Sequence, residues 1–216
     1  MNKFVLEFRK VDLMVYISHL DLQRLFIRSF KRANISLKHS QGFNPHPAMS
    51  FAQPLSLGYE GLHEYIEFET NCEFNTDDIK NMMSEVMPIG ISILNCSKYS
   101  GSKSLAATTN ACKYDVIFPK VKIDVDSYLS QAEILAQKRQ KKSKRLKEVN
   151  IKDKIRNIEC TENKEDTILH LHLDGGSESN LSPELIIQSI TKFLDVPVDR
   201  NDIKIIRKEI IFQTAK

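Results

Sequence analysis

The fold is constrained most by the spacing of apolar residues, which changes along the chain between two patterns. Apolar residues at every second position indicate half-buried strands, whereas apolar residues spaced by three and four positions indicate amphipathic helices. In the first half, this pattern predicts strands over 4–9, 35–39, 64–69 and 89–99, and helices over 20–33 and 75–87 with Thr76 as the cap of the second helix. The resulting order of strand, helix, strand, strand, helix, strand is that of the ferredoxin-like βαββαβ unit.

The same order begins again after the small, polar segment 101–110, which we expect to be a linker. Strands are predicted over 114–119, 167–173 and 203–212, a basic strand or hairpin over 144–159, and helices over 125–140 and 183–194. We therefore predict an α+β fold of two tandem ferredoxin-like halves with antiparallel sheets. The halves are expected to span 1–104 and 105–216, the second with a basic insertion near 138–156.

The predicted helix over 20–33 has two different faces. Ser18 can accept a hydrogen bond from the backbone amide of Asp21, whose carboxylate suits the positive first turn of a helix. An apolar stripe is formed by Leu22, Leu25, Phe26, Phe30 and Ala33, and a basic ridge by Arg24, Arg28, Lys31 and Arg32. Two interpretations of the ridge stay open: an ordinary solvated surface, or a site that binds anions.

The helix is followed by a loop, GFNPHP at 42–47, that no generic core requires. Its glycine and two prolines exclude a regular helix, and each proline holds the residue before it in an extended conformation. Such a stiff loop loses little entropy when it engages a ligand, and Phe43, Asn44 and His46 offer an aromatic ring, an amide and an imidazole. The loop is either a recognition element or a proline-rich crossover that turns the chain.

Three motifs carry a specific resemblance: SHLDLxRxxxR from Ser18, GFNPHP from Gly42 and SFAxPLxLG from Ser50. Together they are similar to the radical SAM-linked protein family, a bacterial domain of unknown function that occurs fused to, or beside, a cobalamin-binding radical SAM protein. The resemblance covers roughly residues 3–70 and continues more weakly to the C-terminus, where NLSPELIIQSI resembles a second block. It implies a partner and not a reaction, so it assigns no catalytic residue.

The cysteines stand singly, without the CxxC or CxxxCxxC spacing that would hold zinc or an iron–sulfur cluster. They are Cys72, Cys96, Cys112 and Cys160. We therefore expect no metal and no cofactor in this chain, and any radical chemistry would belong to the partner.

His170 and His172 share one face of a predicted strand, since side chains repeat every two residues. A metal site would need at least a third ligand, and the sequence fixes none nearby. The alternative is that the leucines at 169, 171 and 173 face the core while both histidines face water.

The net charge of +3 conceals basic and acidic blocks, and the most basic one is 138–156. Such blocks either steer a polyanion or are merely solvated. In EYIEFE, Tyr65, Glu67 and Glu69 are expected to point outward and to repel an RNA backbone from the sheet. Candidate binding residues therefore lie on the ridge, the loop and the basic run: Ser18, Asp21, Arg24, Arg28, Arg32, Ser40, Gly42, Phe43, Asn44, Pro45, His46, Pro47, Lys141, Lys142, Lys144 and Arg145.

Three functions stay open, because motifs of the GxxxxGK[ST], GxGxxG, GxSxG and HExxH types are absent. The leading hypothesis is a non-catalytic accessory protein that docks with a radical SAM partner and presents an RNA or ribosome-associated substrate. The second is a metal-independent RNA-processing enzyme in which His46 or His19 transfers a proton and the ridge arginines stabilise phosphate charge. The third is a small-molecule binding module with GFNPHP as a pocket wall.

No apolar run is long enough to span a membrane, and charges interrupt the N-terminal residues where a signal peptide would be apolar. We therefore expect a cytoplasmic protein without membrane contact.

Overall fold

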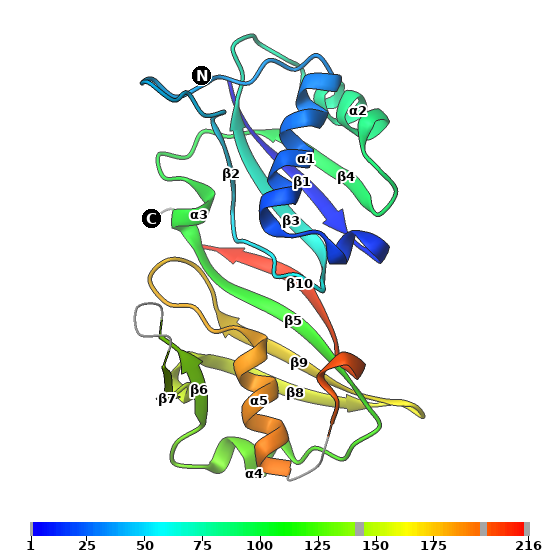
Figure 1. Cartoon of the computed structure of the whole chain (residues 1–216), viewed down its shortest axis with the longest axis vertical. Helices are drawn as coiled ribbons and strands as arrows, with labels where there is room; N and C mark the ends of the chain where they lie inside the picture. The colour runs from blue at the N-terminus through cyan, green and yellow to red at the C-terminus, as the bar shows by residue number, and fades with distance from the viewer. Residues whose placement is uncertain (1, 141–144, 195–197, 214–216) are drawn as a thin grey trace. The chain divides into compact units, whose positions relative to one another are not determined.

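The computed structural model describes residues 2–140, 145–194 and 198–213. It has a mixed α+β fold with mostly antiparallel strands, and the chain divides into two compact units (Figure 1). Unit 1 runs up to Thr109 and takes in Phe212 and Gln213, whereas unit 2 is Asn110–Ile211. The boundary between the units therefore lies between Thr109 and Asn110, whereas the sequence predicts it between residues 104 and 105.

Unit 1 is an antiparallel sheet with two helices on one face (Figure 1). Its elements are β1 Lys3–Lys10, the 3-10 helix η1 Asp12–Tyr16, α1 His19–Arg32, β2 Met49–Phe51, β3 Tyr59–Glu69, α2 Thr76–Val86, β4 Ile91–Lys98 and the short α3 Leu105–Thr108. The strand order is β4-β1-β3, with β2 paired to β3.

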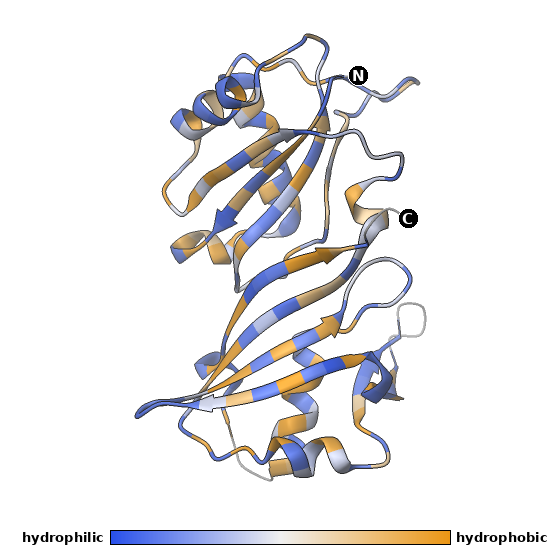
Figure 2. Cartoon of the chain, turned by 180° about the vertical axis from the view of Figure 1, so that it is seen from behind, coloured by the Kyte–Doolittle hydropathy of each residue, from blue (hydrophilic) through white to orange (hydrophobic). Residues whose placement is uncertain are grey.

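The core of unit 1 follows directly from the two periods of the sequence. Alternate residues of β1, including Leu6 and Phe8, are buried, as are Phe26 and Phe30 on the inner face of α1. Rings interlock across this layer, with centroids 4.8 Å apart for Phe8 and Phe26. The alternation of polar and apolar residues along the strands is visible in Figure 2.

Unit 2 has four antiparallel strands, a covering helix and a two-stranded hairpin that is a sheet of its own (Figure 1). Its elements are β5 Thr109–Pro119, α4 Val125–Ser130, β6 Leu135–Arg139, β7 Leu146–Asn150, η2 Lys152–Lys154, β8 Ile155–Glu162, β9 Asp166–Asp174, α5 Pro183–Leu194, η3 Arg200–Asp202 and β10 Lys204–Phe212. The sheet order is β10-β5-β9-β8, and β6 pairs with β7.

Most predicted elements are confirmed, with α1, α2 and α5 within a few residues of their expected bounds. The strand predicted over 35–39 is wrong, because only isolated bridges form there, Leu37 with Thr70 and His39 with Pro47. The cap of α2 is Asn75 rather than Thr76, since the Asn75 side chain accepts from the Asp77 amide.

The long helix predicted over 125–140 is also wrong. The helix α4 ends at Ser130, and residues 135–139 form β6, which pairs with β7. The basic strand or hairpin predicted over 144–159 corresponds to β7 and the start of β8. The expected linker over 101–110 is partly regular structure, because it contains α3 and the first residues of β5.

No helix within the described ranges is long and apolar enough to cross a membrane.

Candidate functional site

The first turn of α1 is a closed hydrogen-bonded cluster. The Ser18 hydroxyl donates to the Asp21 carboxylate over 2.7 Å and accepts from the Asp21 amide over 3.2 Å, as the sequence predicts. Arg24 donates to the same carboxylate over 2.9 Å. The Ser18 hydrogen bond, followed by that of Arg24, lowers the pKa of Asp21. These three predicted site residues therefore satisfy one another and stabilise the start of the helix.

The rest of the basic ridge is different, because its side chains are not held in ion pairs within the described part of the chain. Arg28, Lys31 and Arg32 are all exposed. Among the residues that the structure describes, none of the three makes a salt bridge. Lys31 and Arg32 lie in the last turn, where positive charge offsets the negative end of the helix dipole. Arg28 lies one turn earlier and is the ridge cation best placed to attract an anion.

The helix ends in a Schellman motif that turns the chain back. The Asn34 amide donates to the Lys31 carbonyl over 3.2 Å, and the Ile35 amide donates to the Phe30 carbonyl over 2.9 Å. Asn34 has φ 55°, in the left-handed region that asparagine tolerates better than most residues. As a result, Ile35 is buried directly beyond the end of α1.

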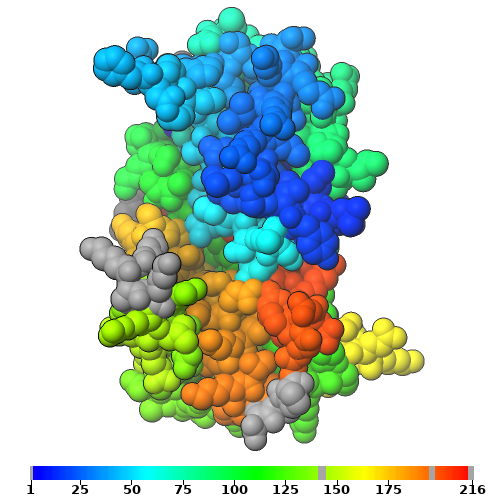
Figure 3. All heavy atoms as spheres, viewed as in Figure 1, coloured from blue at the N-terminus to red at the C-terminus, as the bar shows by residue number. Residues whose placement is uncertain are grey.

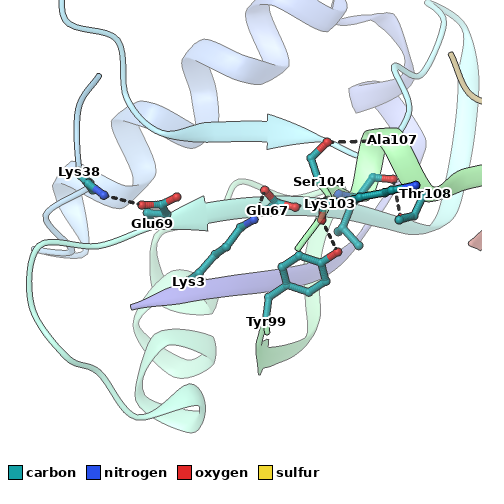
Figure 4. Close-up of polar contacts among 10 residues, drawn as sticks. Lys3, Lys38, Glu67, Glu69, Tyr99, Lys103, Ser104, Ala107 and Thr108 are labelled. Atoms are coloured by element: carbon teal, nitrogen blue, oxygen red, sulfur yellow. Dashed lines mark hydrogen bonds and ion pairs between the residues drawn. The ribbon is translucent and has the colours of Figure 1, made fainter. Parts of the chain in front are cut away.

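The segment after this turn is anchored along the end of β3. The Lys38 amide donates to the Glu69 carbonyl over 2.8 Å, and the Lys38 ammonium pairs with the Glu69 carboxylate over 2.9 Å (Figure 4). The Asn71 side-chain amide donates to the Ser36 hydroxyl over 2.8 Å. The base of the predicted loop is therefore fixed to the sheet.

The GFNPHP loop projects from unit 1, and it is closed at its base. The Ser40 amide donates to the His46 carbonyl over 2.8 Å, and the His46 amide donates to the Ser40 hydroxyl over 3.0 Å. Residues 41–46 are all exposed, and the ring of Phe43 is fully so. Gly42 has φ +133°, which L-residues with side chains rarely adopt. The projection is visible as the light-blue extension in Figure 3.

A pocket of about 420 Å³ lies between the second half of α1 and the segment 34–47. Its lining residues are Ile27, Arg28, Phe30, Lys31, Asn34, Ile35, Ser36, Leu37, His39 and Pro47. It thus brings together two predicted site residues, Arg28 and Pro47, that lie far apart in the sequence. We call it the α1 pocket.

Neither predicted catalytic histidine lines the α1 pocket. The His19 ring packs edge-on against Phe51, with centroids 5.0 Å apart. His46 is exposed at the loop base and is held there through its backbone. The histidine in the pocket is His39, which the sequence analysis missed. Ile35, Leu37 and His39 occupy every second position of an extended segment, and this spacing could have predicted that His39 lies on the same side as the two buried residues.

The outer face of β3 is not the open acidic surface that the sequence suggests. Glu67 is buried, and it pairs with Lys3 over 2.8 Å and accepts from the Leu105 amide over 2.8 Å (Figure 4). The expectation that Glu67 repels an RNA backbone from an open face is therefore wrong, since the segment that ends in α3 covers this part of the sheet. Glu69, by contrast, is only partly buried.

In unit 2, the polar residues of the sheet form a cross-strand ladder. Leu169, Leu171 and Leu173 are buried, which confirms their predicted orientation. The His170 ring lies 2.8 Å from Asp115 through Nδ1 and 2.9 Å from the Thr161 hydroxyl through Nε2. Burial, followed by the nearby positive charges, lowers the pKa of His172.

The predicted basic run is described only in part. Lys141, Lys142 and Lys144 lie outside the described residues. Arg145 is exposed, and its carbonyl accepts from the Gln140 amide over 2.9 Å.

Within the described ranges, no three histidine, cysteine or acidic residues gather as a metal site would require. The cysteines are free, and Cys96 and Cys112 are buried. Burial raises the pKa of Cys96 to about 12, so this thiol is kept protonated.

One end of unit 1 exposes large apolar side chains. Leu13, Tyr16, Leu20, Leu57 and Ile89 are between 61% and 94% exposed, and we call them the η1 patch. Hydrogen bonds join their segments: the Val11 amide donates to the Gly90 carbonyl over 2.9 Å, and the Gly58 amide donates to the Val15 carbonyl over 2.8 Å. The dark-blue and cyan surfaces of these segments adjoin in Figure 3.

Comparison with known proteins gives a family and a similar fold. Residues 3–183 match the model of a family described as an uncharacterized protein conserved in bacteria, DUF2344. No curated protein matches the chain. A chain in the crystal structure of a Cbf5–Nop10–Gar1 complex is similar, with a TM-score of 0.51 and 12% sequence identity over 96% of this chain. The match spans 48% of that chain, and at this identity the likeness concerns the fold alone.

Proposed function

The chain belongs to the DUF2344 family of uncharacterized proteins conserved in bacteria, and we propose that it is a non-catalytic accessory protein that docks with a cobalamin-dependent radical SAM partner. In this role it presents the substrate of the partner, which carries the cofactors and the chemistry. The partner follows from the resemblance of the SHLDL and GFNPHP motifs to radical SAM-linked proteins. The role implies a cytoplasmic location.

The η1 patch is the observation that carries the proposal. Scattered single apolar residues are normal on protein surfaces, but a cluster of large ones marks interaction sites. Four chain segments, three of them joined by backbone hydrogen bonds, bring the five side chains of the patch to one end of unit 1. Such a rigid apolar surface suits docking to a second protein, because little conformational freedom is lost on binding.

The GFNPHP loop supports the presenting half of the proposal. Its closed base and exposed tip are typical of a recognition element that is ordered before it meets a ligand. Arg28, Lys31 and Arg32 provide positive charge on the same unit, which would favour a polyanion such as RNA or a ribosome-associated target. Docking and RNA binding therefore concern different surfaces and are testable separately.

We further infer that each unit is a ferredoxin-like module. In unit 1, the strands β1 to β4 are ordered β4-β1-β3, with β2 against β3. In unit 2, the strands β5, β8, β9 and β10 repeat this order as β10-β5-β9-β8. The hairpin of β6 and β7 is then an insertion into the second module. This repetition supports the two tandem halves expected from the sequence.

The test is size-exclusion chromatography of the chain mixed with the radical SAM protein encoded beside it in the native host. The proposal predicts a shared peak at micromolar concentrations. Separate elution of the two proteins would contradict it.

A further inference from the structure

The charged residues that line the α1 pocket are all positive, and the apolar cavity beside them is not needed for docking through the η1 patch. Its two charged residues, Arg28 and Lys31, are both positive, and they lie one helical turn apart on α1. None of the ten lining residues is acidic. Because Lys31 also offsets the end of the helix dipole, the excess positive charge at the pocket rests mainly on Arg28.

Two polar side chains that line the pocket, Ser36 and Asn34, can donate hydrogen bonds. The Ser36 hydroxyl oxygen accepts from Asn71, so its own hydrogen is left to donate toward another acceptor. The Asn34 side chain supplies an amide that can donate as well. The Leu37 carbonyl can only accept, so the His39 Nδ1 donates to it over 3.1 Å and is not available to a ligand. A donor-rich rim matches a ligand with several acceptor oxygens.

The rest of the pocket is apolar. Ile27, Phe30, Ile35, Leu37 and Pro47 contribute hydrocarbon surface. Its volume of about 420 Å³ lies within the range of small-molecule pockets, roughly 300–1,000 Å³. The ligand should therefore combine an apolar body with a compact anion.

We propose that the α1 pocket binds a small organic phosphate, with a ring on the apolar floor and the phosphate against Arg28 and Lys31. A phosphate monoester carries three terminal oxygens, which suits a guanidinium, an ammonium and a hydroxyl better than the two oxygens of a carboxylate do. A nucleoside monophosphate and a simple aryl phosphate share this chemistry. The site is independent of the docking role, and it survives if no radical SAM complex forms.

Isothermal titration of the full chain tests the proposal with four probes: uridine monophosphate, phenyl phosphate, uridine and inorganic phosphate. We expect the two organic phosphates to bind at least tenfold more tightly than uridine or inorganic phosphate, because only they fill both parts of the pocket. Tighter binding of the nucleotide than of phenyl phosphate would identify a nucleotide site, and the reverse order a site for another aryl phosphate.

The variants R28A and K31E should each weaken phosphate binding at least tenfold, a loss of about 1.4 kcal/mol. R24A is the matched control, because Arg24 lies on the same helix, is bound to Asp21 and does not line the pocket. It should change the affinity less than twofold. All three residues are exposed, so the fold should be retained. Equal losses in R24A and R28A, or no binding of either organic phosphate at millimolar concentration, would overturn the proposal.

Discussion

Ser40 and His46 close the base of the GFNPHP loop through two reciprocal hydrogen bonds. One runs between backbone groups over 2.8 Å, and the other joins the His46 amide to the Ser40 hydroxyl over 3.0 Å. Only the loop base is restrained in this way, and the tip with Phe43 stays in solvent. The loop is therefore closed at its base and open to solvent at its tip.

Replacing Ser40 by alanine should loosen the loop without unfolding unit 1. The substitution removes one side-chain hydrogen bond, worth about 0.5–1.5 kcal/mol. We expect the His46 amide to exchange its hydrogen several-fold faster, while the melting temperature stays nearly constant. Hydrogen exchange with mass spectrometry or NMR detection measures this. The exposed Ser50 provides the control S50A, and equal exchange in S40A and wild type would show that the hydroxyl does not hold the loop.

Asn34 should prove sensitive to the type of substitution because of its positive φ. The left-handed conformation costs about 1–2 kcal/mol for a residue with a β-carbon, and asparagine and aspartate tolerate it better than other such residues. Glycine has no β-carbon and avoids this cost. We therefore expect N34A to lower the free energy of unfolding by about 1 kcal/mol relative to N34G. Urea denaturation compares the two variants directly, and equal midpoints would mean that the turn after α1 does not require the left-handed conformation.

Asp21 should make stability depend on pH at the acidic end. Its pKa is lowered in the folded chain, first by Ser18 and then by Arg24, so its contribution is complete above the unfolded pKa. That contribution is lost as the pH falls through the lower folded pKa. Urea midpoints of wild type and D21N should therefore differ near neutral pH and converge in acid. A constant difference across the pH range would contradict this assignment.

The basic ridge should dominate any binding of single-stranded RNA. Affinity should fall at least tenfold between about 50 and 200 mM salt if several phosphates are contacted. Removing two phosphate contacts in R28A/R32A should reduce the slope of log K against log salt by about 1.4. K98A/K103A, with two basic residues elsewhere on unit 1, is the control. Equal slopes for both double variants would place RNA away from the ridge.

Local signals explain why α1 could be predicted nearly to the residue. Ser18 and Asp21 mark the start of the helix, and Leu22, Phe26 and Phe30 recur at helical spacing and are buried. The capping residues and the apolar stripe therefore indicate the same helix. The same signals failed over 125–140. There the strand β6 buries only Ala136 and exposes three of its five residues, so its alternation is too short to be recognised as a strand period.

The candidate sites were accessible to prediction only in part. The ridge and the loop follow from residue types and spacing, but the α1 pocket depends on how residues 34–39 return against α1. Pro47 and Arg28 come together there because the Schellman turn at Asn34 and the anchoring of Lys38 on β3 fix the return path. The η1 patch has no periodic signature either, since its five residues come from four segments.

The affinity between this chain and the neighbouring radical SAM protein tests the central claim most directly. Titration calorimetry should give a dissociation constant in the micromolar range or below for the wild type. The variant L13S/I89S should weaken it at least tenfold, because both side chains are more than 80% exposed and would lose their contacts with the partner. L146S, an exposed leucine on β7, should bind like the wild type. No complex with the wild type, or equal affinities of L13S/I89S and L146S, would contradict docking through the η1 patch.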